Sequence, residues 1–208
     1  VLLQPDLGTA AILFSILFGL LFLGGVRLSH LGALALAGCL GLALLILQAP
    51  YRADRLTTFL HPDLQPLGIG YQMNQAFLAI GSGGLTGLGF NHSRQKFQYL
   101  PEVHADSIFA VVAEEMGFVV VAGFIILLLI VCYRGFRIAA RAPNEFGRLL
   151  TAGIILWFMV QSFFNIGAMV GVLPLTGVPL PFMSHGGTSL AIAMAAVGLV
   201  MNVSRQPV

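Results

Sequence analysis

Ionisable residues gather in one stretch of this chain, immediately before a long apolar segment. Residues 93–106 read SRQKFQYLPEVHAD and contain two cations, two carboxylates and a histidine. A carboxylate at the edge of an apolar segment is partly desolvated, which raises its pKa toward the range where a general base works well. Asp106, the last residue of the stretch, is therefore a candidate base for a hydroxyl group. The alternative is a helix N-cap, because Asp accepts hydrogen bonds from the first amides of a helix.

Other residues of this stretch are candidate substrate contacts. Arg94 and Lys96 could hold a pyrophosphate of the substrate, or anchor the chain to lipid phosphates. His104 is either a polar residue at the membrane interface or a substrate contact. No spacing of ligand residues here is typical of a metal site, and none is predicted. The candidate substrate-binding residues are Arg94, Gln95, Lys96, Glu102 and His104.

Two further carboxylates, Glu114 and Glu115, lie about two to three helical turns beyond Asp106, inside the apolar segment. A carboxylate is costly at that depth and normally faces a cavity or a partner, so both are candidate functional residues. The alternative is a buried structural pair with an arginine. Helix geometry places Glu114 about 80° and Glu115 about 180° round the axis from Asp106, so at most one is expected to share its cavity.

The glycine-rich stretch 81–89, GSGGLTGLG, precedes the ionisable residues. Such a stretch could bring backbone amides close to an anion. It is not a P-loop, because no Gly-Lys-Ser/Thr follows it. The second interpretation, compatible with the first, is that the glycines make tight turns in a re-entrant loop.

The chain that positions these residues is strongly apolar, with 58% hydrophobic and 9% charged residues. Soluble domains carry about a quarter charged residues, so most of this chain must face lipid. The net charge of +2 is small and the arginines are scattered, which excludes the basic surface of a nucleic-acid-binding protein. Cys39 and Cys132 lie in apolar runs and are predicted to act as small hydrophobic residues.

Five apolar segments have about the length needed to cross a membrane, the last of them being the shortest. Backbone groups in lipid must be satisfied within their own segment, and no alternating barrel pattern is present, so the segments are predicted to be helices. The predicted fold is all-α, a polytopic transmembrane helix bundle with a long extracytoplasmic loop. The spans are expected at about 7–26, 31–47, 108–132, 149–172 and 189–203.

Arginines flank the predicted link between the third and fourth spans, which places that link in the cytoplasm. The long loop at about 49–105 is then extracytoplasmic. Residues 4–9 and the proline-rich residues 172–188, which cannot continue a helix, are predicted to lie at the same face.

Two polar patterns indicate local packing. In the long loop, Met73, Phe77 and Ile80 recur at helical spacing, which predicts a short amphipathic helix on the membrane surface. In the fourth span, Gln161 and Asn165 are four residues apart and share one helix face, so they are expected to hydrogen-bond across the bundle.

Together these residues form an ordered series of motifs that resembles the SEDS family, the shape, elongation, division and sporulation proteins that include RodA and FtsW. Agreement of so many long motifs by chance is remote. They are QPDLGT at 4–9, AIGSGG at 79–84, QK at 95–96, LPEVHADSIFA at 100–110, AEEMG at 113–117, NIG at 165–167 and LPLTGVPLPF at 173–182.

The resemblance implies a peptidoglycan glycosyltransferase that polymerises lipid II at the outer face of the bacterial cytoplasmic membrane, with a class B penicillin-binding transpeptidase as partner. Family members have about ten spans, so this chain is expected to be the C-terminal half, inactive by itself. The family's essential aspartate falls on Asp106. Two residues depart from the family pattern: Ser107 replaces a usual Phe and leaves open a changed packing at the helix start, and His185 replaces a frequent Tyr.

The mechanistic hypothesis is that Asp106 takes a proton from the 4-hydroxyl of one lipid-linked disaccharide as it attacks the anomeric carbon of another. Inversion at that carbon calls for one base and no covalent enzyme carboxylate. Arg94, Lys96 or a divalent cation such as Mg²⁺ or Mn²⁺ could neutralise the departing pyrophosphate. The alternatives are a flippase for lipid-linked precursors, which would use Glu114 and Glu115, and a noncatalytic scaffold for the transpeptidase.

Overall fold

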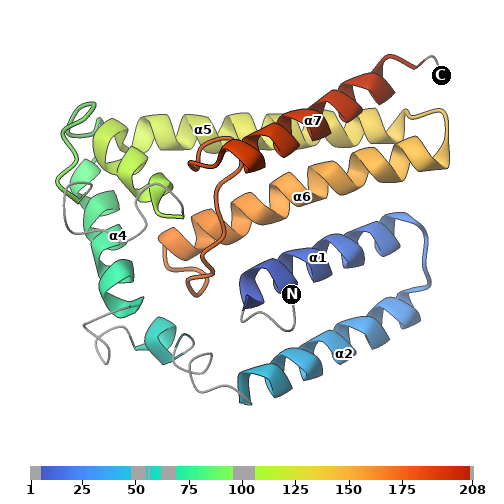
Figure 1. Ribbon diagram of the computed structural model, residues 1–208, viewed down its shortest axis with the longest axis horizontal. Coiled ribbons are helices and arrows are strands. Elements are labelled where there is room, and N and C mark those ends of the chain that lie inside the picture. Colours follow the sequence, from blue (N-terminus) through green and yellow to red (C-terminus); the bar gives the residue numbers. More distant parts are fainter. Residues whose placement is uncertain (1–5, 48–54, 56, 62–68, 96–105, 207–208) are drawn as a thin grey trace.

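The computed structural model describes residues 6–47, 55, 57–61, 69–95 and 106–206, and within them the secondary structure is helical, with no strand. The predicted all-α class is therefore confirmed. A short helical turn covers residues 57–60. The longer helices are α1 (Leu7–Leu23), α2 (Leu28–Leu47), α4 (Ile69–Gly83), α5 (Ile108–Ala140), α6 (Glu145–Met169) and α7 (Gly187–Ser204) (Figure 1).

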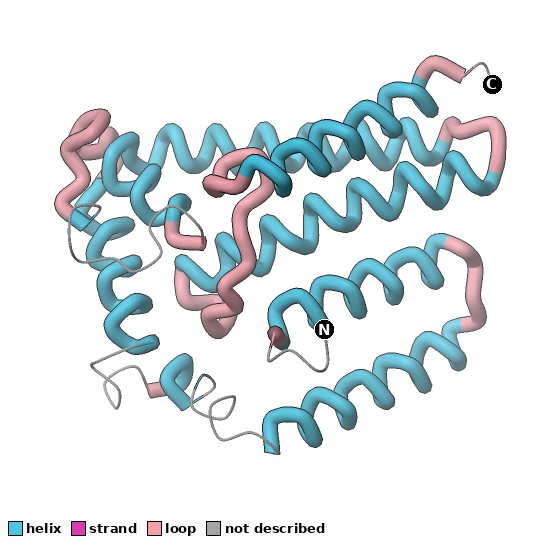
Figure 2. Tube along the Cα trace, viewed as in Figure 1, coloured by secondary structure: helices cyan, strands magenta, loops and turns pink. Residues whose placement is uncertain are grey.

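The apolar helices form a bundle in which α6 packs against α1, α5 and α7, and α2 packs against α1 (Figures 1 and 2). In the described residues, α5, α6 and α7 are long and apolar enough to cross a membrane, and α1 and α2 are shorter apolar helices. Side chains such as Leu36, Ile126 and Met194 are more than half exposed, as expected of helices that face lipid. The chain is a multi-pass membrane protein.

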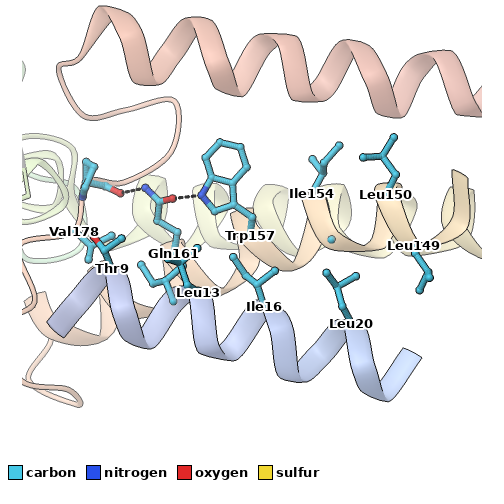
Figure 3. Close-up of a pocket in the computed structure, with 13 residues that line it drawn as sticks. Thr9, Leu13, Ile16, Leu20, Leu149, Leu150, Ile154, Trp157, Gln161 and Val178 are labelled. Carbon is cyan, nitrogen blue, oxygen red and sulfur yellow. Dashed lines mark hydrogen bonds between the residues drawn. The ribbon is translucent and has the colours of Figure 1, made fainter. Parts of the chain in front are cut away.

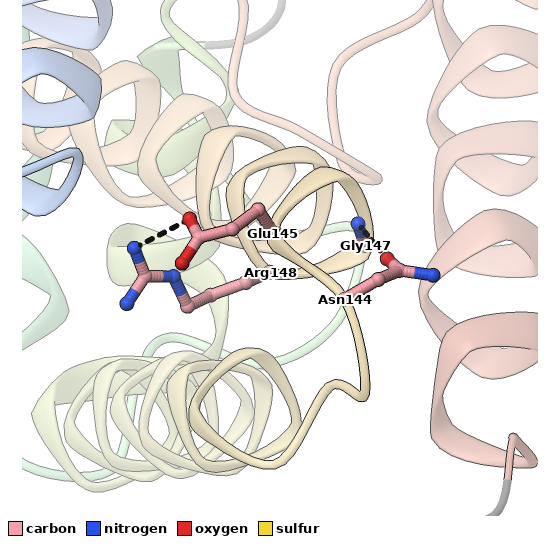
Figure 4. A network of polar contacts seen from close by, with 4 residues as sticks. All are labelled: Asn144, Glu145, Gly147 and Arg148. Carbon is pink, nitrogen blue, oxygen red and sulfur yellow. Dashed lines mark hydrogen bonds and ion pairs between the residues drawn. The ribbon is translucent and has the colours of Figure 1, made fainter.

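The arginine-rich end of the bundle holds the α1–α2 turn, the α5–α6 turn and the end of α7 (Figure 1). At the start of α6, the side chain of Asn144 accepts a hydrogen bond from the amide of Gly147 at 2.7 Å. Beside it, Arg148 pairs with Glu145 at 2.7 Å (Figure 4). That this end faces the cytoplasm stays a prediction from the arginine count.

The opposite end brings together the start of α1, helix α4, the start of α5 and residues 170–186 (Figure 1). Gly8 lies so close to the proline-rich segment that an ideal Cβ on it would be 2.6 Å from the carbonyl oxygen of Thr176. Asp6 caps α1 through the amide and hydroxyl of Thr9, at 3.0 and 2.6 Å. Partial burial raises the pKa of Asp6, but these bonds and the nearby Arg55 outweigh it and hold the pKa below 3.8.

Helix α4 is the amphipathic helix expected in the long loop, and it lies across the end of the bundle (Figure 1). Met73, Ala76 and Ala79 are buried in a cluster with residues of α5. Phe77, by contrast, is 37% exposed. The apolar face of α4 therefore meets protein.

Helix α5 consists of two helical pieces that meet at Gly117. Gly117 has φ 76° and ψ 178°, a backbone conformation that is almost restricted to glycine. The break removes the helical hydrogen bonds that the carbonyl groups of Glu114 and Glu115 would otherwise accept from residues 118 and 119. These four backbone groups need other partners, because an unsatisfied backbone group in a membrane is costly.

The glycine-rich segment 84–89 supplies those partners through four backbone hydrogen bonds of 2.9–3.2 Å. The two backbones approach so closely that an ideal Cβ on Gly87 would lie 2.2 Å from the carbonyl oxygen of Glu115. The glycines thus make tight turns against α5, and the amides of residues 87–89 bind protein carbonyl groups rather than an anion. The four bonds join the amides of Leu88 and Gly89 to the carbonyls of Glu114 and Glu115, and the amides of Phe118 and Val119 to the carbonyls of Gly84 and Leu85.

The substitution Gly117→Ala is expected to destabilise the protein by roughly 3 kcal/mol or more, because it adds backbone strain and a clash. The new Cβ would lie 2.3 Å from the amide nitrogen of Gly87. Gly123→Ala, in the same helix but with no outside atom within 4 Å, should be neutral or stabilising by up to about 1 kcal/mol. Thermal unfolding in detergent measures both, and equal midpoints for the two variants would contradict the role assigned to Gly117.

Candidate active site at the start of α5

Asp106 lies directly before the N-cap of α5 and is 8% exposed. The helix begins at Ile108 and its N-cap is Ser107, which makes no side-chain capping bond. The N-cap alternative for Asp106 was therefore misplaced by one residue. The departure from the family pattern, Ser107, is itself fully buried at the cap.

The carboxylate of Asp106 is held by neighbours from two helices. The side-chain amide of Gln72 in α4 donates toward both carboxylate oxygens at 3.4 Å and to the hydroxyl of Ser107 at 3.1 Å. The Ser107 hydroxyl donates to Oδ1 of Asp106 at 3.2 Å. These bonds are long, and they orient the carboxylate at the start of α5.

The backbone of Asp106 is fixed by Asn165 of α6. The Asn165 amide is 1% exposed and donates to the carbonyl of Asp106 at 2.8 Å and to the carbonyl of Val178 at 2.7 Å. One turn earlier, Gln161 donates to the carbonyl of Pro179 at 2.7 Å and accepts from the indole of Trp157. The two amides were correctly predicted to hydrogen-bond, but their partners are loop carbonyl groups and Asp106.

The proline-rich segment closes over the carboxylate. Leu175, Val178 and Leu180 are buried and anchor the segment to the bundle. Between them, Gly177 has a positive φ of 67°, and an ideal Cβ on it would lie 4.0 Å from Oδ2 of Asp106. The segment therefore passes close to the Asp106 carboxylate at Gly177.

Glu114 is 1% exposed, and its carboxylate holds the loop that precedes α5. It accepts a hydrogen bond from the Ser93 hydroxyl at 2.5 Å and from the backbone amides of Arg94 and Gln95 at 3.0 and 3.4 Å. Glu115 is also buried, at 7% exposure. Glu114 is thus tied to the residues that lead into the predicted substrate-binding stretch, and none of these recorded contacts involves Asp106.

The candidate substrate contacts are only partly described. Arg94 is exposed and Gln95 is half-buried. Lys96, Glu102 and His104 lie outside the described residues. Within the described part of the chain, no group of three or more His, Cys, Asp or Glu side chains could hold a metal ion. The described residues therefore offer no ligand set for a divalent cation.

Sequence reasoning missed two residues of the site, Gln72 and Gly177. Gln72 was visible as a polar residue of the amphipathic helix, and Gly177 as part of a proline-rich motif. Their approach to Asp106 depends on how three segments pack, which no local pattern encodes.

An apolar cavity of about 580 Å³ lies near this site, between α1 and α6 (Figure 3). Leu13, Ile16 and Leu20 line it from α1, and Thr9 and Gln161 are the polar residues at one end. None of the predicted site residues lines it. Its lining suits a hydrocarbon chain rather than a sugar.

The substitution Asn165→Ala is expected to lower the free energy of unfolding by about 2–4 kcal/mol, because it leaves the buried carbonyl groups of Asp106 and Val178 without their donor. Asn202→Ala, at an exposed position of α7, should change it by less than about 0.5 kcal/mol. Equal unfolding midpoints for the two variants would argue against the bridging role of Asn165.

The substitution Glu114→Gln is expected to loosen residues 93–95. The glutamine side chain keeps one acceptor oxygen, and its NH₂ group would face the hydroxyl and backbone amides that donate to Glu114 in the wild type. Hydrogen–deuterium exchange at the amides of Arg94 and Gln95 should become roughly tenfold faster or more. Glu145→Gln, an exposed carboxylate at the other end of the bundle, is the control. Unchanged exchange in the Glu114 variant would contradict the anchoring role.

Comparison with known proteins identifies the family of this chain. The family model of the FtsW, RodA and SpoVE cell cycle proteins matches residues 1–207. Stage V sporulation protein E of Bacillus subtilis is 45% identical over 99% of this chain and 56% of its own length. The probable peptidoglycan glycosyltransferase FtsW of Idiomarina loihiensis is 44% identical over 99% of this chain and 51% of its own length.

A solved structure, described as the structural coordination of polymerization and crosslinking by a peptidoglycan synthase complex, shares the fold. It has a TM-score of 0.76 and 32% identity, over 98% of this chain and 57% of that chain. The chain thus spans about half the length of the curated relatives it matches. With its motifs in order and its helices arranged as in that structure, this chain belongs to the SEDS family of FtsW, RodA and SpoVE proteins.

Proposed function

We propose that the protein carrying this chain is a peptidoglycan glycosyltransferase of the bacterial cytoplasmic membrane, which polymerises lipid II at the outer face. The observation that carries the proposal is the buried Asp106 at the start of α5, whose carboxylate accepts from Gln72 and Ser107 and whose backbone carbonyl accepts from Asn165. Relatives named as probable peptidoglycan glycosyltransferases support the reaction class. The similar synthase complex supports a class B penicillin-binding transpeptidase as partner.

In this mechanism Asp106 acts as general base. It accepts the proton of the 4-hydroxyl of one lipid-linked disaccharide as the oxygen attacks the anomeric carbon of another, and undecaprenyl pyrophosphate leaves. The carboxylate is suited to this step because it is largely buried at the start of α5, where desolvation favours a base. A single base suffices, because displacement from an α-linked pyrophosphate inverts the carbon without a covalent enzyme intermediate.

The leaving pyrophosphate requires charge neutralisation more than a proton. Arg94 is the described cation assigned to this step, since its side chain is exposed while its backbone amide is bound to Glu114. Lys96, two residues on, is the second cation of the proposal. A divalent cation such as Mg²⁺ or Mn²⁺ is the alternative source of this charge neutralisation.

The contacts of Glu114 favour polymerisation over the flippase alternative. A carboxylate that served a transport path would face that path, whereas the Glu114 carboxylate binds Ser93 and two loop amides. The scaffold alternative gives no reason for a buried carboxylate at Asp106, and it fails if the purified protein polymerises lipid II alone.

The substitution Asp106→Asn in the full-length protein should reduce lipid II polymerisation by about 10²–10⁴, the usual contribution of a general base. The unfolding midpoint should stay close to that of the wild type. Glu145→Gln removes an exposed carboxylate at the opposite end and should leave the rate unchanged.

The pH profile distinguishes a base from a residue that only positions the site. The acid limb of kcat/KM should be lost in the Asp106→Asn protein and kept in the control. Near-normal glycan product from a normally folded Asp106→Asn protein would sink the base assignment.

A further inference from the structure

A second pocket lies at the arginine-rich end of the bundle, between the ends of α5 and α7, far along the helices from Asp106 (Figure 1). Its volume is about 510 Å³, within the roughly 300–1,000 Å³ of small-molecule sites. The proposed polymerisation uses no residue of this pocket. Its lining consists of Arg134, Arg137, Ile138, Arg141, Val203, Ser204 and Gln206.

The three arginines are arranged as a binding surface. Arg134, Arg137 and Arg141 are three and four residues apart, so they lie on one face of α5. Arg137 also lies over the ring of Tyr133, at 5.8 Å. Ser204, whose hydroxyl donates to the carbonyl of Met201 at 2.7 Å, and Gln206 line the pocket from the end of α7.

The positive charge of this pocket is not balanced by protein carboxylates. Beyond Glu115 the sequence contains one acidic residue, Glu145, and it pairs with Arg148. Among the described residues, the guanidinium groups of Arg134, Arg137 and Arg141 make no recorded ion pair or hydrogen bond. Three unpaired guanidinium groups around one pocket suit a phosphate, which arginine binds with parallel hydrogen bonds.

The surface next to the pocket identifies the kind of phosphate. Ile130 and Leu127 lie four and seven residues before Arg134, on the same face of α5, and are 50% and 58% exposed as lipid-facing residues. The acyl chains of a phospholipid could pack against this apolar strip, formed by Leu127 and Ile130, while its head group bound in the pocket. A free phosphate ion would gain nothing from the strip.

We propose that this pocket binds the head group of an anionic phospholipid from the leaflet at the arginine-rich end, which the arginine count predicts to be cytoplasmic. Basic pockets between transmembrane helices on that side suit such head groups. The site is distinct from general attraction to an anionic surface, because Arg27 and Arg148 lie at the same end and do not line the pocket. The bound head group would bridge α5 and α7, which make few direct contacts with each other.

The test compares two double variants of the full-length protein with the same loss of charge. Arg134→Gln/Arg141→Gln removes two pocket arginines, and Arg27→Gln/Arg148→Gln removes two at the same end outside it. Binding to nanodiscs of phosphatidylcholine with added phosphatidylglycerol is read by native mass spectrometry as lipid retained. The pocket variant should retain phosphatidylglycerol about 30-fold less tightly, near fivefold per arginine, and the control should match the wild type.

Three outcomes would overturn the proposal. The first is that the wild-type protein retains phosphatidylcholine and phosphatidylglycerol equally. This measurement does not depend on whether the variants fold. The second is an equal loss in both double variants, which would mean general surface attraction. The third is inorganic phosphate, added in phosphatidylcholine alone, binding the wild type as well as phosphatidylglycerol does, which would make the pocket a small-anion site.

Discussion

The break in α5 at Gly117 is the constraint on which this end of the molecule depends. Backbone groups within a membrane must be hydrogen-bonded, and the break leaves two carbonyl groups and two amides without helical partners. The glycine-rich segment 84–89 supplies all four, which docks the end of α4 onto α5. Because only glycine tolerates the conformation at 117 and the close approach at 87, the two glycine motifs must be present together.

The short first piece of α5 then organises the site around it. Asp106 precedes this piece, and Glu114 near its end holds residues 93–95 through three hydrogen bonds. Asn165 joins Asp106 to the proline-rich segment, and Gln72 reaches the carboxylate from α4. Segments far apart in the sequence are thereby held around Asp106. A buried polar network of this kind is stabilising only when its polar groups have hydrogen-bond partners.

The sequence allowed the helices to be predicted, because the length of an apolar segment reports directly on a helix in lipid. A helix occupies each of the five predicted apolar segments, and α4 was expected from its spacing. Contacts between segments were not predictable in the same way. Gln72 was not linked to Asp106, and the backbone hydrogen bonds between the two segments at Gly117 leave no periodic pattern in the sequence. The glycine count could indicate tight turns but not their partner.

The account as a whole rests on Asp106 meeting the acceptor sugar. The most direct measurement is a structure of the full-length protein with two lipid II analogues bound. It should place a carboxylate oxygen of Asp106 within about 2.6–3.2 Å of the acceptor 4-hydroxyl, or one water away from it. A complex in which both sugars are bound for reaction while the Asp106 carboxylate points away from that hydroxyl would contradict the account.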